Sequence, residues 1–64
     1  MKEVVLRIPE EVRLAIGPGK DLAGELLKRI AVALYAEKKI SMGKAVELSG
    51  LTYDRFMDLL GEVG

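Results

Sequence analysis

Few side chains in this 64-residue chain could do chemistry, because it contains neither histidine nor cysteine. An imidazole base, a disulfide and a zinc site of the usual ligands are therefore excluded. Ser41 and Ser49 have no neighbouring base to activate them as nucleophiles. Asp54 and Asp58 could in principle hold a magnesium ion, but two carboxylates one helical turn apart on an exposed helix are usually just solvated. We therefore expect no enzyme activity, no metal site and no cofactor.

The segment AVELSGLTYDRFMDLL, residues 45–60, has a pattern typical of a DNA-reading helix-turn-helix. A helix rich in small residues runs into Gly50, and Thr52 can cap a second helix that would lie in the DNA groove. The predicted turn residues are thus Gly50, where a positive φ is expected, and Thr52.

The outward face of that second helix carries the wrong charge for DNA. Phe56 marks its buried face, and steps of about 100° per residue place three carboxylates together on the opposite side. These are Asp54, Asp58 and Glu62, with Arg55 at the edge, while the core face holds Tyr53, Leu59, Leu60 and Val63. DNA affinity depends on Lys and Arg, and the Asn and Gln side chains that read adenine are absent from the chain. The segment therefore indicates a packing motif more than a base-reading helix.

Charge is balanced overall but uneven along the chain. Ten basic side chains match ten acidic ones, for a formal net charge of zero. Residues 1–40 hold eight basic and six acidic side chains, a net of +2, whereas residues 41–64 hold two and four, a net of −2. Any contact with nucleic acid is therefore expected mainly in the first half, at Lys2 and Arg7, with Arg55 the remaining candidate.

Residues 2–8, KEVVLRI, alternate as a half-buried β-strand does. One face carries Val4, Leu6 and Ile8, and the other carries Glu3, Val5 and Arg7. A lone strand cannot satisfy its own backbone groups, and the chain offers no second strand candidate. We therefore expect it to pair with the same strand of a second subunit. Its outer face then either contacts DNA through Arg7 or is solvated or covered by a partner.

Four helices should follow the strand. Pro9 begins a short helix that ends at Ile16, and Asp21 caps a long one to about Lys39. Ser41 and Thr52 cap the last two. Within the long helix, IAVALYA, residues 30–36, is apolar on every side, which requires burial on every side. The predicted dimer interface comprises Val4, Leu6 and Ile8 of the strand with Ile30, Leu34 and Tyr35 of the helix.

A single, mainly α domain over residues 1–64 accounts for these patterns. Residues 1–39, the strand and two helices, would serve dimerisation, and residues 40–64 would form the helix-turn-helix-like unit. A chain this short buries only about 60% of its unfolded surface, so a homodimer would supply stability that its core lacks. No signal peptide opens the chain, and the longest uncharged helical stretch is too short for a bilayer, so we expect a cytoplasmic protein.

The order of VLRIPEEV, a long ALY-containing helix and KISMGKAVELSGLTYDRFMDLL resembles a family of small uncharacterised prokaryotic proteins predicted to be antitoxins. The most specific part is the ISxGKAxELxGLxxxxFxxLL frame, residues 40–60. The N-terminal strand and helix are similar to the opening of ribbon-helix-helix repressors, in which two strands pair across a dimer. The chain departs from these patterns at Val46, where helix-turn-helix proteins usually have Ala, and in its short first helix.

Two functions follow from this resemblance and from the residues. One is an antitoxin-like protein that binds a partner toxin and could also autoregulate its operon. The other is a small dimeric DNA-binding transcriptional regulator. The unfavourable charge of the last helix favours the partner-binding function.

Overall fold

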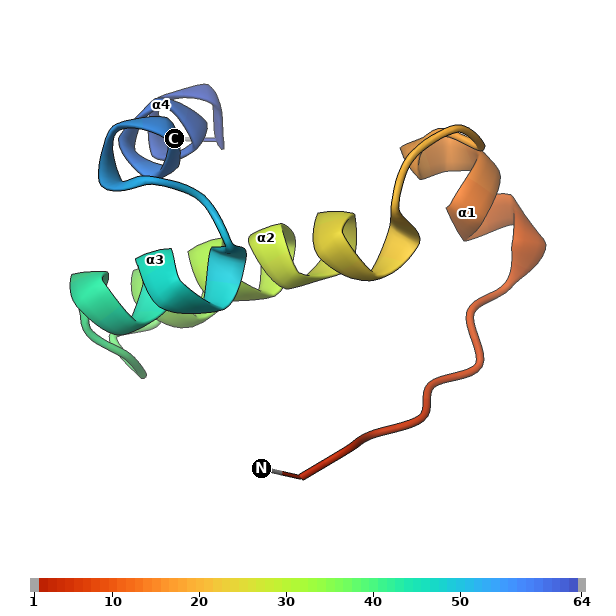
Figure 1. Ribbon diagram of the computed structural model, residues 1–64, viewed down its shortest axis with the longest axis horizontal. Helices are drawn as coiled ribbons and strands as arrows, with labels where there is room; N and C mark the ends of the chain where they lie inside the picture. The colour runs from red at the N-terminus through yellow and green to blue at the C-terminus, as the bar shows by residue number, and fades with distance from the viewer. Residues whose placement is uncertain (1, 64) are drawn as a thin grey trace.

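The computed structural model describes residues 2–63, which contain four helices (Figure 1). They are α1, Glu10–Ile16; α2, Leu22–Ala36; α3, Met42–Ser49; and α4, Tyr53–Val63. Helix α3 packs along the C-terminal half of α2, and α4 lies across this pair, while α1 sits at the opposite end of α2 (Figure 1). The predicted mainly helical fold with four helices is confirmed.

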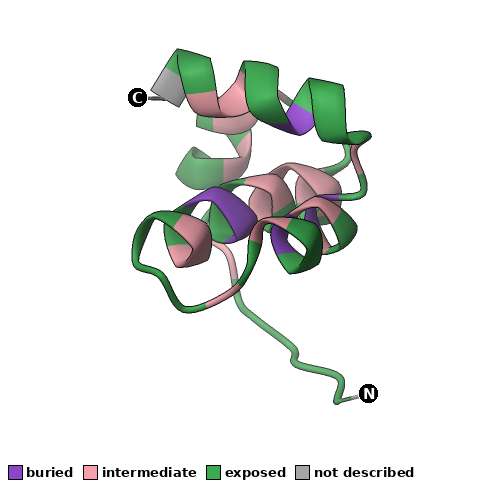
Figure 2. Ribbon diagram, turned by 90° about the vertical axis from the view of Figure 1, so that its left-hand side faces the viewer, coloured by how far each residue is buried: buried purple, intermediate pink, exposed green. Residues whose placement is uncertain are grey.

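The core lies where α2, α3 and α4 meet, and Phe56 of α4 is its largest fully buried side chain. Ala31 of α2 and Ala45 of α3 are also completely buried, and Val32 is 8% exposed (Figure 2). Tyr35 packs edge-to-face against Phe56, with ring centroids 6.3 Å apart and planes at 82°, a favoured aromatic geometry. The partly buried hydrophobic residues around this cluster are Tyr35, Ile40, Met42, Val46, Leu48, Leu51, Leu59 and Leu60.

The hydroxyl side chains of Ser41 and Thr52 cap the N-terminal ends of α3 and α4. The backbone N–H of Lys44 donates to Ser41 Oγ at 3.2 Å, and that of Arg55 donates to Thr52 Oγ1 at 3.3 Å. Each hydroxyl thereby satisfies one of the free N–H groups of a first helical turn. Asp21 occupies the capping position of α2, but its side chain makes no capping hydrogen bond.

The turn between α3 and α4 depends on Ser49 and Gly50. Gly50 has a φ of 73° and a ψ of 8°, the left-handed conformation that glycine adopts without a Cβ penalty. The buried Ser49 hydroxyl donates to the carbonyl of Val46 at 2.8 Å and accepts from the N–H of Leu51 at 3.1 Å. These bonds satisfy backbone groups at the point where the chain leaves α3.

The strand expected at residues 2–8 is not present in this chain, where these residues lie in neither a helix nor a strand. Val4, Val5 and Leu6 are 75%, 93% and 63% exposed. The physical reason is that no other described segment runs beside them as a strand, so their backbone groups have no ladder to join. Pairing of this segment with a second subunit stays a prediction.

Helix α2 also ends earlier than predicted, at Ala36 rather than near Lys39. Lys38 takes a left-handed φ of 61°, and two bonds close the helix end: Lys38 N–H to the Tyr35 carbonyl at 3.0 Å, and Lys39 N–H to the Leu34 carbonyl at 2.9 Å. This is the hydrogen-bond pattern of a Schellman motif. It reverses the chain so that α3 can return along α2.

One burial prediction is wrong. Tyr53, expected on the core face of α4, is 56% exposed at the first helical position. Within residues 30–36, α3 and α4 bury only Ala31 and Val32, while Ala33 and Ala36 are exposed, so burial of this segment on every side stays a prediction for the homodimer.

Two glycines with open space around them test the turn geometry. An added Cβ meets nothing within 4 Å at either Gly43 or Gly50, but only Gly50 has a positive φ. We expect Gly50→Ala to lower the free energy of unfolding by about 1 kcal/mol through backbone strain. Gly43→Ala, inside α3, should raise it by about 0.5 kcal/mol through helix propensity. Urea unfolding of both variants checks this pair, and equal effects would contradict the strain argument.

Candidate interaction surfaces

The predicted dimer-interface residues fall into two groups. Val4 and Leu6 are exposed, and Ile30 is 41% exposed, so these three are accessible to a second molecule. Ile8 and Leu34 are half-buried, and Tyr35 packs against Phe56 in its own chain. Further exposed large apolar side chains in the same half of the chain are Val5, Val12, Leu14 and Leu27. We call all the exposed residues of both lists the N-terminal apolar set.

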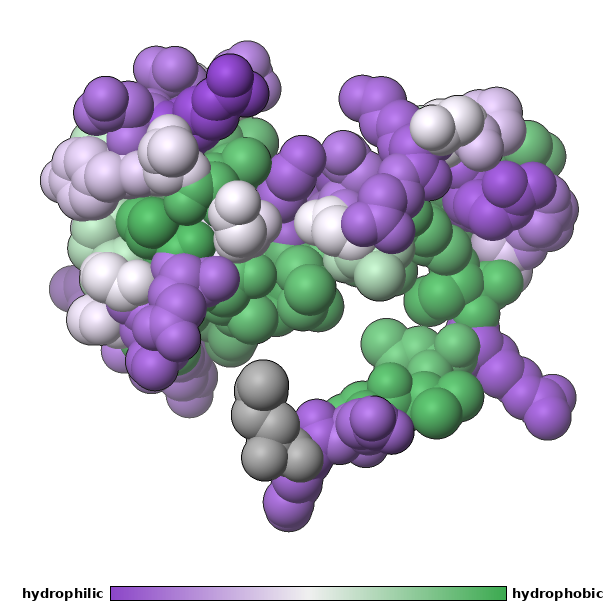
Figure 3. Space-filling model, in the orientation of Figure 1, coloured by the Kyte–Doolittle hydropathy of each residue, from purple (hydrophilic) through white to green (hydrophobic). Residues whose placement is uncertain are grey.

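The N-terminal segment stands away from the helices as an arm. In Figure 3 it is separated from the body of α2 by open space, and apolar side chains gather along it. Helix α1, which follows, has no buried residue. The apolar groups of this half of the protein are therefore poorly covered by the chain itself.

The three candidate DNA-binding residues are not brought together. Lys2 and Arg7 are exposed on the N-terminal segment, whereas Arg55 is exposed on α4. Figures 1 and 2 both show these two elements on opposite sides of α2. The three side chains therefore do not form one basic patch in a single chain.

Helices α2 and α4 border an open groove of about 1020 Å³, which we call the α2–α4 groove. The α2 wall carries Glu25, Lys28 and Arg29, with Lys20 just before the helix, and further along α2 it carries Val32, Ala33 and Ala36. The α4 wall carries Arg55, Asp58, Leu59 and Glu62, and Leu51 lies at the turn before α4. On α2, charged residues therefore line the N-terminal part of the groove and apolar residues line its C-terminal part.

Glu25 organises the charge of the α2 wall. Its carboxylate accepts from Arg29 Nη1 at 3.1 Å and from Lys28 Nζ at 3.2 Å. Hydrogen bonds from Arg29 and then Lys28 hold the pKa of Glu25 below its ordinary value, so the carboxylate stays charged at neutral pH. One carboxylate shared by two cations leaves this wall net positive.

The α4 wall has the opposite balance. Asp58 and Glu62 outnumber Arg55, and the four ion pairs among the described residues include neither acid. The sequence placed Asp54, Asp58 and Glu62 together on an outward face. In the structure Asp58 and Glu62 line the groove beside α2, whereas Asp54 does not.

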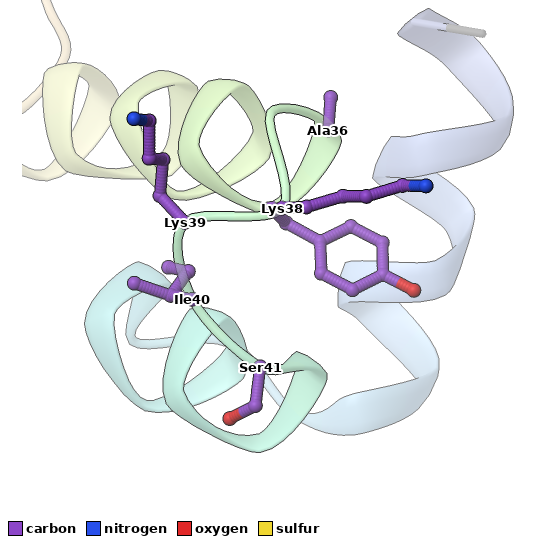
Figure 4. A pocket seen from close by; sticks show the side chains of 6 residues that line it. Ala36, Lys38, Lys39, Ile40 and Ser41 are labelled. Atoms are coloured by element: carbon purple, nitrogen blue, oxygen red, sulfur yellow. The ribbon is translucent and has the colours of Figure 1, made fainter.

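A smaller hollow of about 570 Å³ lies at the loop between α2 and α3. Lys38 and Lys39 line it with Tyr35, Ala36, Ile40 and Ser41 (Figure 4). The two lysine side chains extend to opposite sides of the loop (Figure 4), so their ammonium groups do not converge on one anion.

The described residues contain no group of three or more metal-ligating side chains placed to hold an ion. Nor does any helix within residues 2–63 have the length and apolar character needed to cross a membrane.

Residues 1–64 match the uncharacterised protein family UPF0175, and the chain therefore belongs to this family. Comparison with curated proteins and with solved structures finds no match. The predicted resemblance to a small uncharacterised family is confirmed at this level.

Sequence reasoning missed the α2–α4 groove. One signal in α2 could have indicated it, since Glu25 and Arg29 stand at ion-pair spacing. This signal does not identify α4 as the other wall, because that depends on how the α3–α4 turn directs the chain.

The left-handed conformation of Lys38 makes it possible to test whether its side chain contributes to the free energy of unfolding. A non-glycine residue in this conformation costs roughly 1–2 kcal/mol, so we expect Lys38→Gly to raise the free energy of unfolding by about 1 kcal/mol. Lys39→Gly, where φ is not positive, should lower it by about 0.5 kcal/mol. Thermal melting of the two variants measures the difference. Loss of stability in Lys38→Gly would show that its side chain contributes more than the conformation costs.

Proposed function

We propose that this protein is a non-catalytic, antitoxin-like interaction protein that forms a homodimer and binds a partner protein, a toxin, in the cytoplasm. The observation that carries the proposal is the N-terminal apolar set, because exposed apolar groups of this kind mark protein–protein contact sites. Membership of the family over residues 1–64 is consistent with it. The ISxGKAxELxGLxxxxFxxLL frame, which resembles predicted antitoxins, supports the toxin as the class of partner.

The homodimer is the first step of this function. In it, residues 2–8 of two chains pair as strands, which supplies the backbone partners that each lacks alone. Val4, Leu6 and Ile8 then face inward, toward the exposed Ile30 and the half-buried Leu34 of α2. Each large aliphatic side chain removed from water contributes about 1.5–3 kcal/mol.

Alternate residues of the arm provide matched variants for the dimer. Leu6→Glu should produce a monomer, because it places a charge in the paired apolar face. Val5→Glu, at a position 93% exposed and on the other face, should remain dimeric. Sedimentation equilibrium at micromolar concentration measures both. A wild-type monomer, or equal behaviour of the two variants, would contradict strand pairing.

The partner is tested by co-expression with the product of the neighbouring reading frame. We expect the tagged protein to co-purify with it and to relieve any growth inhibition that the neighbour causes when expressed alone. Leu6→Glu, if the dimer is the binding form, should relieve it less than Val5→Glu. Failure of the wild type to bind or neutralise the neighbour would refute the antitoxin-like function.

A second candidate, a dimeric DNA-binding regulator, is favoured by the tight left-handed turn at Gly50, which joins α3 to α4 as in a helix-turn-helix. The charges of α4 oppose it, since Asp54, Asp58 and Glu62 would approach phosphates. If DNA is bound, the N-terminal segment is the better candidate through Lys2 and Arg7.

A salt series decides where DNA would bind. Arg7→Ala should weaken binding and flatten the salt slope by about one unit per lost phosphate contact. Asp54→Ala with Asp58→Ala should leave binding equal or tighter, because it removes repulsion. Fluorescence anisotropy with duplex DNA measures both variants. Loss of sequence preference in the aspartate variant alone would instead identify α4 as the reading helix.

A further inference from the structure

We propose that an apolar face of α2 packs, in antiparallel orientation, against the same face of a second copy of this chain. The two-fold axis of this contact passes beside the midpoint between residues 28 and 29. The inference rests on the homodimer of the proposed function. It adds a contact between helices, with a defined register, that the pairing of residues 2–8 does not determine by itself.

Helix α2 carries an apolar stripe that the core of its own chain does not cover. Four aliphatic residues follow at intervals of four, three and four positions, a spacing that keeps them on one side of a helix: Ala23, Leu27, Ile30 and Leu34. Leu27 and Ile30 are each 41% exposed, and Ala23 is exposed as well. Leu34 is half-buried but does not pack against the core cluster around Phe56. We call these four residues the α2 seam.

The sizes of the seam residues fit an antiparallel pair. Ala23 and Leu34 lie equally far from the midpoint between residues 28 and 29, and so do Leu27 and Ile30. Reversal therefore sets each Ala23 opposite the partner's Leu34, a small side chain against a large one, and each Leu27 opposite the partner's Ile30. A parallel pair would set Ala23 against Ala23 and Leu34 against Leu34, with a void at one end and crowding at the other. Antiparallel helices also place opposite ends of their macrodipoles side by side.

No charged side chain has to leave water when two seams meet. The helix positions that flank the seam are also uncharged: Gly24 and Ala31 on one side, Leu26 and Ala33 on the other. Lys28 and Arg29 lie further round the helix, where both pair with Glu25. The formal net charge of the chain is zero, so two copies do not repel each other through their overall charge.

The seam is continuous with the surface that the arms offer to the dimer. Figure 3 shows apolar surface on the side of α2 that borders the open space between α2 and the arm, where Val4 and Leu6 are exposed. From Ala23 to Leu34 the seam runs for roughly 17 Å, at about 1.5 Å per residue. A contact of three turns is short, so the paired arms and the paired helices hold the two copies together jointly.

Cross-linking between single cysteines tests the register, because the natural chain has no cysteine. Ala23→Cys and Leu34→Cys are prepared separately and then mixed. In an antiparallel pair the two copies of either position are roughly 17 Å apart along the helices, so a bismaleimide of half that length should join only the mixed variants. A covalent dimer from either variant alone would show a parallel pair, and none in the mixture would show that the seams do not meet. Either result overturns the proposal.

Two positions of matched exposure test the strength of the contact. Ile30 is 41% exposed on the seam, and Met57 is 42% exposed on α4. Ile30→Glu should weaken the dimer by at least about a hundredfold, because two seam side chains are lost per dimer, whereas Met57→Glu should not weaken it. Ile30→Ala, which adds no charge and keeps helix propensity, should weaken the dimer by at least about tenfold. Sedimentation equilibrium measures all three variants. If Ile30→Ala associates as tightly as Met57→Glu and the wild type, the seam is not a contact.

The arm variant separates this inference from the proposed function. If Leu6→Glu is monomeric while Ile30→Glu and Ile30→Ala remain dimeric, the arms alone hold the homodimer. The proposed function then stands, and the seam contact fails. If Ile30→Glu is monomeric while Leu6→Glu remains a dimer with the same cross-link, the seam contact stands and strand pairing fails. A wild-type monomer at micromolar concentration would refute both contacts, and co-purification with the neighbouring gene product would still test partner binding.

Discussion

Burial of Phe56 is the interaction on which the rest of the structure depends. Its ring is the largest fully buried side chain, and around it lie Ala31 and Val32 of α2 and Ala45 of α3. Removing a buried phenylalanine side chain costs about 3–5 kcal/mol, which is comparable with all the stability that a single core supplies to a domain of this size. The helices α2, α3 and α4 therefore pack together mainly around Phe56. The turn at Ser49 and Gly50 directs α4 so that Phe56 reaches this core.

Because the core is small, it leaves many apolar side chains of the N-terminal half exposed. Helix α1 contributes no buried residue, and the arm before it keeps Val4, Val5 and Leu6 in water. Exposed apolar surface on this scale is unfavourable for an isolated chain and favourable for association. The same deficit that makes the monomer marginal thus supplies the driving force for the proposed dimer and partner complex.

The charges of α4 are unfavourable for binding nucleic acid. The tight turn at Gly50 joins α3 to α4, and α4 carries Asp54, Asp58 and Glu62 beside a single arginine. Phosphate neutralisation requires cations, so this surface is better suited to a protein partner. Asp58 and Glu62 line the α2–α4 groove together with Lys28 and Arg29 of α2.

The sequence by itself determined the local structure: four helices, the hydroxyl caps at Ser41 and Thr52, and Phe56 as the centre of the buried face of α4. These follow from periodicity and capping, which act over a few residues. Only the tertiary structure decided that α2 ends at Ala36, that Ala33 and Ala36 remain exposed and that Asp58 and Glu62 line a groove. Each of these depends on the direction in which a turn sends the next helix, and therefore on contacts between residues distant in the chain. Alternation in residues 2–8 predicts a strand, but a strand forms only beside another, and a single chain of this protein does not provide one.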